Sequence, residues 1–261
     1  MKKILFAAVM VLAFCAPAMS MDDTGQSEYG RVVINNHSQQ AGLSPVVFDH
    51  WLHRSLYTCR LCHVDIGFAM EAGESSITAE SNEQGFHCGA CHNGKYKYGD
   101  KVVFASCVDK PAPADSKRCV KCHSMGWDIK MDYVFSEYTK NFPTAGAKKW
   151  IDWEEAERQG FIKPVDYIEG VSVKRAKLKP QEDFSIQSKG SWMSDVIFSH
   201  KKHAVWNGCE VCHPDIFPTV EKGATKYSML EIYDGQYCGV CHNKVAFPLL
   251  DCQRCHTNPV Q

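Results

Sequence analysis

The sequence has almost no net charge and, beyond its first 20 residues, no long apolar segment. Its 29 Lys and Arg residues nearly balance 30 Asp and Glu residues, so no basic field is available to hold nucleic acid. With no later run apolar enough to cross a bilayer, we expect no membrane span. Hydrophobic residues make up 44% of the 261 residues, which is typical of a globular protein and excludes a disordered or fibrous chain.

The N-terminus resembles a secretory signal. Lys2 and Lys3 precede an apolar run over residues 4–14 that is too short to span a bilayer, and small residues follow. Residues 1–20 are therefore predicted to be a signal peptide, and the mature protein is predicted to be periplasmic. Cys15 leaves lipid anchoring as an alternative, although a bulky residue precedes it where a small one is expected.

Cysteine and histidine are abundant, with 14 and 12 residues. Twelve of the cysteines form six Cys-x-x-Cys-His motifs: Cys59/Cys62/His63, Cys88/Cys91/His92, Cys119/Cys122/His123, Cys209/Cys212/His213, Cys238/Cys241/His242 and Cys252/Cys255/His256. This is the attachment signature of c-type haem, in which both thiols bond one porphyrin and the histidine binds its iron. Zinc sites and disulfides are the alternatives, but zinc requires no histidine after every cysteine pair. The predicted cofactors are six covalently bound haems.

An internal repeat divides the chain. A shift of 150 residues superimposes the first two motifs of each half, together with a preceding Phe-x-His-x-x-His at Phe48 and at Phe198. Only the third motif leaves this register, because the first copy has a longer insertion at 94–118. We expect two three-haem domains, at residues 31–126 and 191–261, joined by a connector at 127–190.

The connector has helix signals at one place. Asp152-Trp153-Glu154-Glu155 resembles a capping box and Gly160 suits a helix end, which predicts a short helix over 153–159. We expect the connector to dock the two domains. Residues 171–190, with their run of Lys and Arg from Lys174, are predicted to be an extended, solvated linker.

The repeated Phe-x-His-x-x-His ahead of closely spaced Cys-x-x-Cys-His motifs resembles the triheme, c7-type branch of the class III (cytochrome c3-like) multihaem cytochromes. The resemblance covers residues 46–123 and 196–256. It implies exported electron carriers that are mostly coil with short α-helices wrapped around closely spaced haems. The chain length agrees, because about 40 residues per haem are too few for a core without the porphyrins.

The resemblance also implies the distal iron ligands of the first two haems in each domain. The first histidine of Phe-x-His-x-x-His ligates the first haem, and the second histidine ligates the second haem. Carried across, His50 pairs with His63 and His53 pairs with His92. In the second domain the corresponding pairs are His200 with His213 and His203 with His242.

In this family the distal ligand of the third haem comes from between the first and second motifs. In the second domain Met229 is the candidate. The equivalent position of the first domain is Ala79, so His87 is the candidate there, with Met70 and His37 as alternatives. Thioether sulfur favours reduced iron, so a His/Met haem is expected to have the highest potential.

The predicted function is electron transfer between redox partners, without enzymatic activity. The alternatives are a multihaem reductase with one open haem, or the haem-bearing subunit of a larger quinol-oxidising or metal-reducing complex. After signal cleavage the net charge is about −3, and each ferric haem adds about one negative charge. The oxidised holoprotein is thus about −9, which favours partners with basic docking patches, such as a membrane-bound quinol oxidoreductase or an outer-membrane cytochrome. Cys107, outside the motifs, is predicted to be a buried free thiol.

Overall fold

The structure is a computed structural model that describes residues 26, 29–107, 118–123, 134–146, 149–176, 179, 181–190, 192–247 and 249–257. The predicted signal peptide and Cys15 lie outside the described residues.

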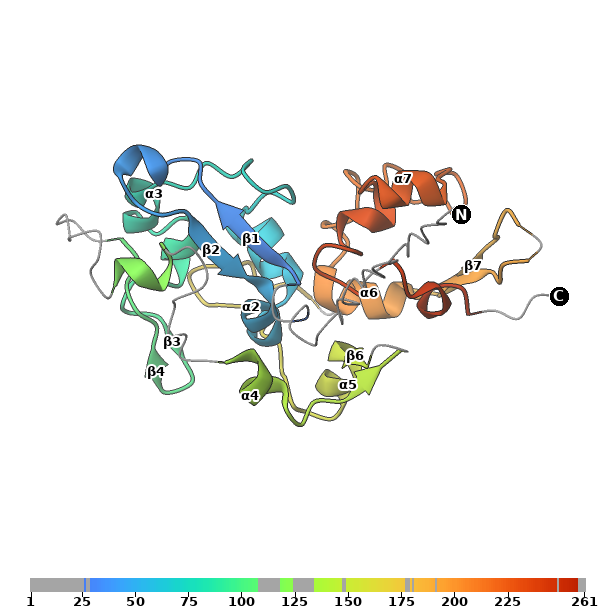
Figure 1. The fold of residues 1–261 in the computed structure, drawn as a ribbon, viewed down its shortest axis with the longest axis horizontal. Coiled ribbons are helices and arrows are strands. Elements are labelled where there is room, and N and C mark those ends of the chain that lie inside the picture. The colour runs from blue at the N-terminus through green and yellow to red at the C-terminus, as the bar shows by residue number, and fades with distance from the viewer. Residues whose placement is uncertain are drawn as a thin grey trace, which may run out of the picture.

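The described chain is mostly coil with short elements, as predicted (Figure 1). Its α-helices are α2 (His50–Leu56), α3 (Ala79–Glu83), α4 (Phe135–Thr139), α5 (Trp153–Arg158), α6 (His200–Asn207) and α7 (Met229–Tyr233). Its strands are β1 (Arg31–Ile34), β2 (Val46–Asp49), β3 (Lys97–Tyr98), β4 (Lys101–Val102), β5 (Thr144–Ala145), β6 (Trp150–Ile151), β7 (Phe184–Ile186) and β8 (Val196–Phe198). They form two-stranded antiparallel pairs, β1 with β2, β3 with β4, β5 with β6 and β7 with β8. The remaining turns are short 3₁₀ segments and one π-helical segment, Gln39–Ala41, Leu61–Ile66, His87–Ala90, Cys119–Lys121, Tyr237–Val240 and Cys252–Arg254.

The sequence repeat is also a structural repeat. Helices α2 and α6 both start at the first histidine of Phe-x-His-x-x-His, and α3 and α7 begin 150 residues apart. Figure 1 shows the two halves side by side, the first in blue and green and the second in orange and red. In each half a strand pair precedes the first motif, β1 with β2 and β7 with β8. The chain therefore contains two similar three-motif units, the first from β1 and the second from β7.

The same local chemistry starts α3 and α7. Thr78 caps α3 through a reciprocal pair of hydrogen bonds with Ser81, and Ser228 caps α7 through the same pair with Glu231. Such capping boxes satisfy backbone N–H groups that a helix of five residues leaves unpaired. Ser81 and Glu231 differ chemically, but each completes the capping box at the N-terminus of its helix.

The predicted helix of the connector is present as α5. Asp152 caps it, and its side chain accepts a hydrogen bond from the Glu155 backbone N–H at 3.0 Å. The second hydrogen bond of a capping box, from the Asp152 backbone N–H to the Glu155 side chain, is not formed. The Asp152 backbone N–H bonds the Pro143 carbonyl, while the Glu155 carboxylate accepts from Arg158 at 2.6 Å.

The connector contacts both units. On the first unit, Tyr138 of α4 donates a hydrogen bond to Ser55 at 3.1 Å, and Asp166 accepts one from Thr58 at 2.7 Å. On the second unit, Lys202 of α6 forms an ion pair with Glu154 of α5 at 2.9 Å. The connector thus lies against α2 and α6 together, below the two units in Figure 1.

The expectation of a solvated, extended linker over 171–190 needs two corrections. Arg175 is an ion-pair partner of Asp65 in the first unit (2.6 Å) and of Glu210 in the second (3.2 Å). Residues 184–186 form β7, because their apolar side chains alternate and pair with those of β8. The partners in these contacts are distant in sequence, so the charges of residues 171–190 alone do not predict them.

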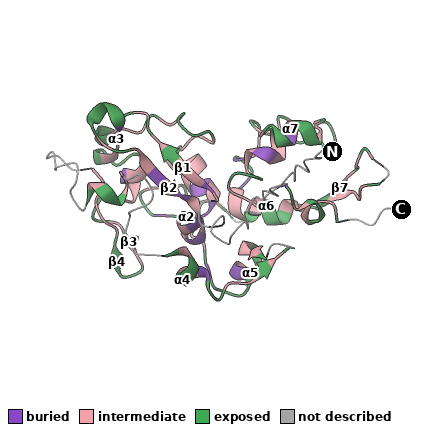
Figure 2. Ribbon diagram, viewed as in Figure 1, coloured by how far each residue is buried: buried purple, intermediate pink, exposed green. Residues whose placement is uncertain are grey.

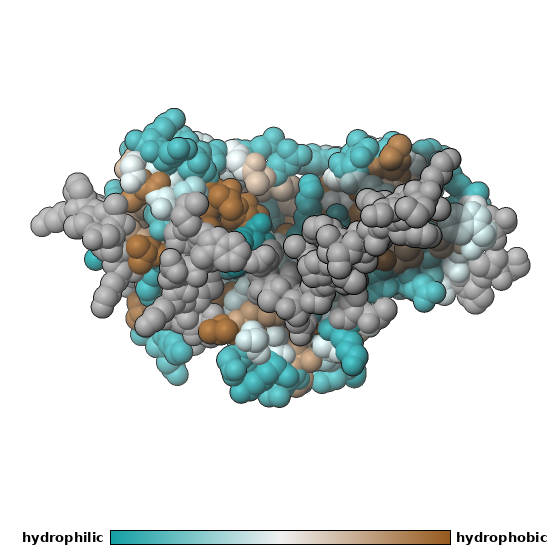
Figure 3. Space-filling view, viewed as in Figure 1, coloured by the Kyte–Doolittle hydropathy of each residue, from teal (hydrophilic) through white to brown (hydrophobic). Residues whose placement is uncertain are grey.

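The apolar core is small for a chain of this length. Only ten hydrophobic side chains of the described residues are buried, and the central cluster consists of Tyr57, Leu61 and Ile168. Figure 2 shows mainly intermediate and exposed residues, and Figure 3 shows apolar side chains at the surface, including over α7, where Leu230 is 71% exposed. Such a fold needs buried surface from something other than its own side chains.

Candidate haem-binding cavity

A single cavity of about 2680 Å³ runs through both units. It is well above the size of a pocket for one small ligand, roughly 300–1,000 Å³. Its lining is mainly apolar. It includes every motif cysteine except Cys119 and Cys209. It also includes these histidines: His50, His53, His63, His87, His92, His203, His242 and His256. The cavity has the size and lining for several large apolar groups.

Three pairs of histidine rings face each other across this cavity. The ring centres of His50 and His63 are 6.5 Å apart with nearly parallel planes, at 3°. The centres are 6.3 Å apart for His53 and His92, and 6.2 Å apart for His203 and His242. Two imidazoles that bind one metal ion from opposite sides, each at about 2 Å, have ring centres roughly 6 Å apart. The observed spacings fit an iron between each pair.

These are three of the four axial pairs that the sequence predicts. The structure does not bring the fourth pair, His200 and His213, into ring contact within the part of the chain it describes. The His200 ring lies instead 5.2 Å from Phe184 and 5.0 Å from Phe198.

The histidine rings are held by backbone carbonyl groups. Nδ1 of His50 lies 2.6 Å from the Gly30 carbonyl oxygen, and Nδ1 of His213 lies 2.6 Å from that of Phe217. The other histidines with an Nδ1–carbonyl contact are His53, His63, His123, His200, His203, His242 and His256. An Nδ1–H bonded to a carbonyl leaves the Nε2 lone pair available, which is the usual arrangement of a histidine ligand.

Burial keeps six histidines of the cavity neutral. Desolvation lowers their pKa below its ordinary value: His50, His53, His63, His92, His203 and His242. For His53 and His242 the pKa falls to about 4. At neutral pH the lone pair that a metal needs is therefore free of a proton.

The cysteines do not support the zinc and disulfide alternatives. All 13 described cysteines are free of disulfides, and no three His, Cys, Asp or Glu side chains of the described residues converge as a metal-binding group. Burial raises the pKa of the Cys62, Cys88 and Cys241 thiols to about 12, so these thiols are protonated at neutral pH. Paired thiols beside facing histidines fit covalent haem.

The third motifs occupy equivalent places although they break the sequence register. His123 forms a β-bridge with Val46, and His256 forms the same bridge with Val196, 150 residues later. Nδ1 of His123 lies 2.8 Å from the Ser44 carbonyl oxygen, and Nδ1 of His256 lies 2.6 Å from that of the equivalent Ser194. The insertion in the first unit therefore leaves the position of its third motif unchanged.

The glycine inside each second motif is required by close packing. A Cβ atom at Gly89 would lie 1.8 Å from the backbone oxygen of Asn82, and one at Gly239 would lie 1.9 Å from that of Ile232. Helices α3 and α7 thus contact the motif backbone directly. This explains why Cys-Gly-x-Cys-His recurs at both places.

The residues predicted as ligands of the third haems lie in different surroundings. Met229 is the first residue of α7, lines the cavity and is 43% exposed. His87 lines the cavity 5.4 Å from Phe68, and its buried Nδ1 has no partner among the described residues. Its place in the second unit is taken by Tyr237, with the same left-handed backbone, φ 47° and 50°. Of the alternatives, Met70 lines the cavity and His37 is exposed.

Cys107 is half-buried and has no disulfide partner. Its sulfur lies 3.9 Å from the Asn82 side-chain nitrogen, and burial raises the pKa of the thiol. The thiol is free, as predicted, but it is half-buried rather than buried.

Sequence reasoning did not single out two residues of the cavity, Arg54 and Trp206. Arg54 directly follows the predicted ligand His53 and extends to the second unit, where it bonds the Val245 carbonyl. The sequence does distinguish Arg54 from its counterpart in the repeat, because the residue 150 positions later is Ala204.

Comparison with known proteins gives one family. The family described as cytochrome c7 and related cytochrome c matches residues 46–124 and 196–257, together more than half of the chain. A c7-type three-heme cytochrome domain is 35% identical over 30% of this chain and 95% of its own, with a TM-score of 0.27. The C-terminal hexaheme fragment of GSU1996 is 25% identical over 87% of this chain and 97% of its own (TM-score 0.27). The dodecaheme cytochrome c GSU1996 is 24% identical over 87% of this chain and 74% of its own, with a TM-score of 0.28. No curated protein sequence matches.

Proposed function

The chain belongs to the family of cytochrome c7 and related cytochromes c, and from that premise we propose that it is an exported hexahaem electron carrier. Its electron-transfer function through several covalent c-type haems follows from the family. The number of haems, their ligands and the export are our proposal. The observation that best supports the proposal is the three pairs of histidine rings that face each other beside Cys-x-x-Cys motifs, with ring centres 6.2–6.5 Å apart.

Haem iron, when bound, supplies the one-electron chemistry. The chain supplies position and environment. The cysteines of each motif would attach one porphyrin, and the histidines would hold its iron. At the three sites where two histidine rings face each other, protein side chains would occupy both sides of the iron and leave no open position for a substrate. This agrees with the family, whose members carry electrons rather than act as enzymes.

The ligand assignment proposed here is the one the sequence predicts. The proximal ligands are His63, His92, His123, His213, His242 and His256, and the distal ligands of the first two haems in each domain are His50, His53, His200 and His203. Met229 is proposed for the third haem of the second domain. For the third haem of the first domain His87 is proposed, with Met70 and His37 as its alternatives.

The partners are proposed to be redox proteins with basic docking patches, because the oxidised holoprotein carries a net charge of about −9. The periplasm is the proposed location, on the evidence of the N-terminal segment. No helix within the described residues has the length and apolarity of a membrane span.

Intact mass tests the haem number and the export together. For protein purified from the exported fraction of its native host, we expect the mass of the chain from Met19 or Met21 plus six haems. A chain from Cys15 with acyl groups would contradict the proposed signal cleavage. A mass with fewer haems would contradict the use of all six motifs.

Substitution of Met229 tests the ligand of the third haem in the second domain. Met229→Leu removes a thioether that favours ferrous iron, so the highest-potential haem is expected to become at least tenfold less reduced at a given potential. A redox titration followed by visible absorbance measures this, with Leu230→Ala as the control, because Leu230 follows Met229 on α7 and is 71% exposed. If six low potentials are found in the parent and the variant alike, Met229 is not a ligand.

In the first domain, three single variants separate the candidates. His87→Leu is expected to give one high-spin haem by EPR, because the iron loses a strong ligand. Met70→Leu and His37→Leu are expected to leave all haems low-spin. High-spin haem in one of these two instead would move the assignment to that residue.

A further inference from the structure

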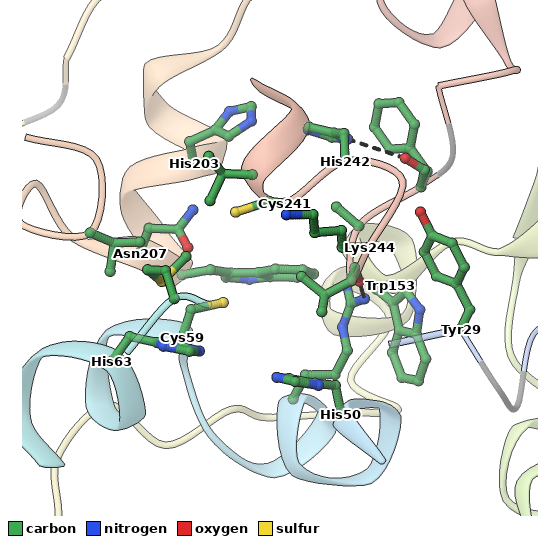
Figure 4. A pocket seen from close by; sticks show the side chains of 18 of the residues that line it. Tyr29, His50, Cys59, His63, Trp153, His203, Asn207, Cys241, His242 and Lys244 are labelled. Atoms are coloured by element: carbon green, nitrogen blue, oxygen red, sulfur yellow. Dashed lines mark hydrogen bonds between the residues drawn. The ribbon is translucent and has the colours of Figure 1, made fainter. Parts of the chain in front are cut away.

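The two units meet where two predicted haem sites share one part of the cavity. Figure 4 shows His50, His63 and Cys59 of the first unit on one side and His203, His242 and Cys241 of the second unit on the other. Cys59 and Cys241 both line this part of the cavity. We call this part of the cavity the junction.

Arg54 lies at the junction and contacts all three parts of the protein. It belongs to α2 of the first unit, donates a hydrogen bond to the Val245 carbonyl of the second unit, and lies 4.9 Å from the Trp153 ring centre of the connector. A second indole, Trp206 of α6, lies 5.6 Å from the guanidinium. The Trp206 N–H is held by Glu157 of α5. The guanidinium therefore has a defined place between two aromatic rings.

The charge of Arg54 has no carboxylate partner in the described chain. Arg31, Arg60 and Arg175 each form an ion pair with an aspartate. For Arg54, the described residues provide two indole rings and one carbonyl instead. A positively charged guanidinium in a largely apolar cavity costs free energy unless an anion pairs with it.

A second hydrogen-bond donor lies at the junction. The Tyr29 hydroxyl is buried and has no hydrogen-bond partner of normal geometry among the described residues, although the Asn243 backbone lies near its oxygen. It lines the cavity together with Arg54, and its ring packs 5.0 Å from that of Trp150. Figure 4 shows Tyr29 beside Trp153, on the same side of the cavity as Lys244. An anion at this place would find two hydrogen-bond donors.

We propose that Arg54, assisted by the Tyr29 hydroxyl, binds a haem propionate at the junction of the two units. The proposal rests on the proposed haem-binding function. Arg54 suits this ligand because a guanidinium pairs with a carboxylate through two parallel hydrogen bonds. The propionate belongs to the haem of Cys59 and Cys62 or to that of Cys238 and Cys241. A positive charge here disfavours ferric haem, so it raises the potential of the junction haem and favours electron entry there.

Redox titration of the holoprotein tests the proposal. For Arg54→Gln we expect one haem to become about tenfold less reduced at a given potential, a shift of about 59 mV for a one-electron couple. Arg54→Lys keeps the charge and is expected to retain most of the parental potential. Arg158→Gln is the control, because it removes the same charge from a side chain that is 72% exposed and paired with Glu155. Equal titrations of Arg54→Gln and Arg158→Gln would overturn the proposal.

Two further results complete the test. A crystal structure of the haem-loaded protein identifies which propionate Arg54 binds, and an Arg54 side chain without a propionate contact overturns the proposal. If Arg54→Gln does not load haem, Tyr29→Phe tests the same carboxylate, with an expected shift of about twofold; no shift counts against the proposal. Failure of the parent protein to bind haem would instead overturn the proposed function. Full loading with unchanged potentials would overturn only this inference.

Discussion

Replacement of His203 by alanine is expected to convert one haem of the oxidised protein from low-spin to high-spin, with the others unchanged. His203 faces His242 at 6.2 Å between ring centres, its Nδ1 lies 2.8 Å from the Ser199 carbonyl oxygen, and its ring stacks on Phe198 at 4.5 Å. In the proposed site, the alanine variant would keep both motif cysteines and His242. The haem would therefore stay attached, and its iron would lose only the ligand proposed to be His203.

EPR of the oxidised protein measures this change, and intact mass shows whether all haems remain. Lys201→Ala is the matched control, because Lys201 is an exposed neighbour on the same helix, α6. A high-spin haem is also expected to bind added imidazole, which restores the low-spin signal. If His203→Ala remains entirely low-spin without imidazole, His203 is not the distal ligand.

Much of this site could be predicted from the sequence because it is encoded by local patterns. Cys-x-x-Cys-His places three groups on one turn, so no distant contact is needed to recognise it. The histidines predicted to be distal ligands recur at a shift of 150 residues, and the structure places three of the four predicted pairs face to face. The helix at 153–158 was predictable for the same reason, because its cap and its end lie within eight residues.

What the sequence could not show depends on contacts between distant residues. The equivalence of His123 and His256 is set by strand bridges to Val46 and Val196, which compensate for unequal insertions. Arg54 belongs to no motif, and its place between two tryptophans requires both units and the connector. Such contacts depend on how distant segments pack, so they cannot be predicted from composition or from the spacing of residues.

The attachment of the connector to the first unit is a further contact of this kind, and it predicts a large stability effect. Arg60 is buried, with 4% of its surface exposed, and its guanidinium pairs with the carboxylate and the carbonyl of Asp166. Thr58 donates a second hydrogen bond to the same carboxylate at 2.7 Å. Removal of one partner of a buried pair leaves an uncompensated charge, which costs about 3–5 kcal/mol when both groups are buried.

For Asp166→Ala we expect the free energy of unfolding to fall by about 2–3 kcal/mol, less than the full range because the Asp166 side chain is 52% exposed. Denaturant unfolding of the holoprotein, followed by circular dichroism, measures it. Glu137→Ala removes the partner of the exposed Lys140 and is expected to change stability by no more than about 0.5 kcal/mol. Because Asp166 binds no cysteine or histidine of a motif, the haem number is expected to stay the same. A loss of stability no larger than that of Glu137→Ala would show that the connector is not held to the first unit through this pair.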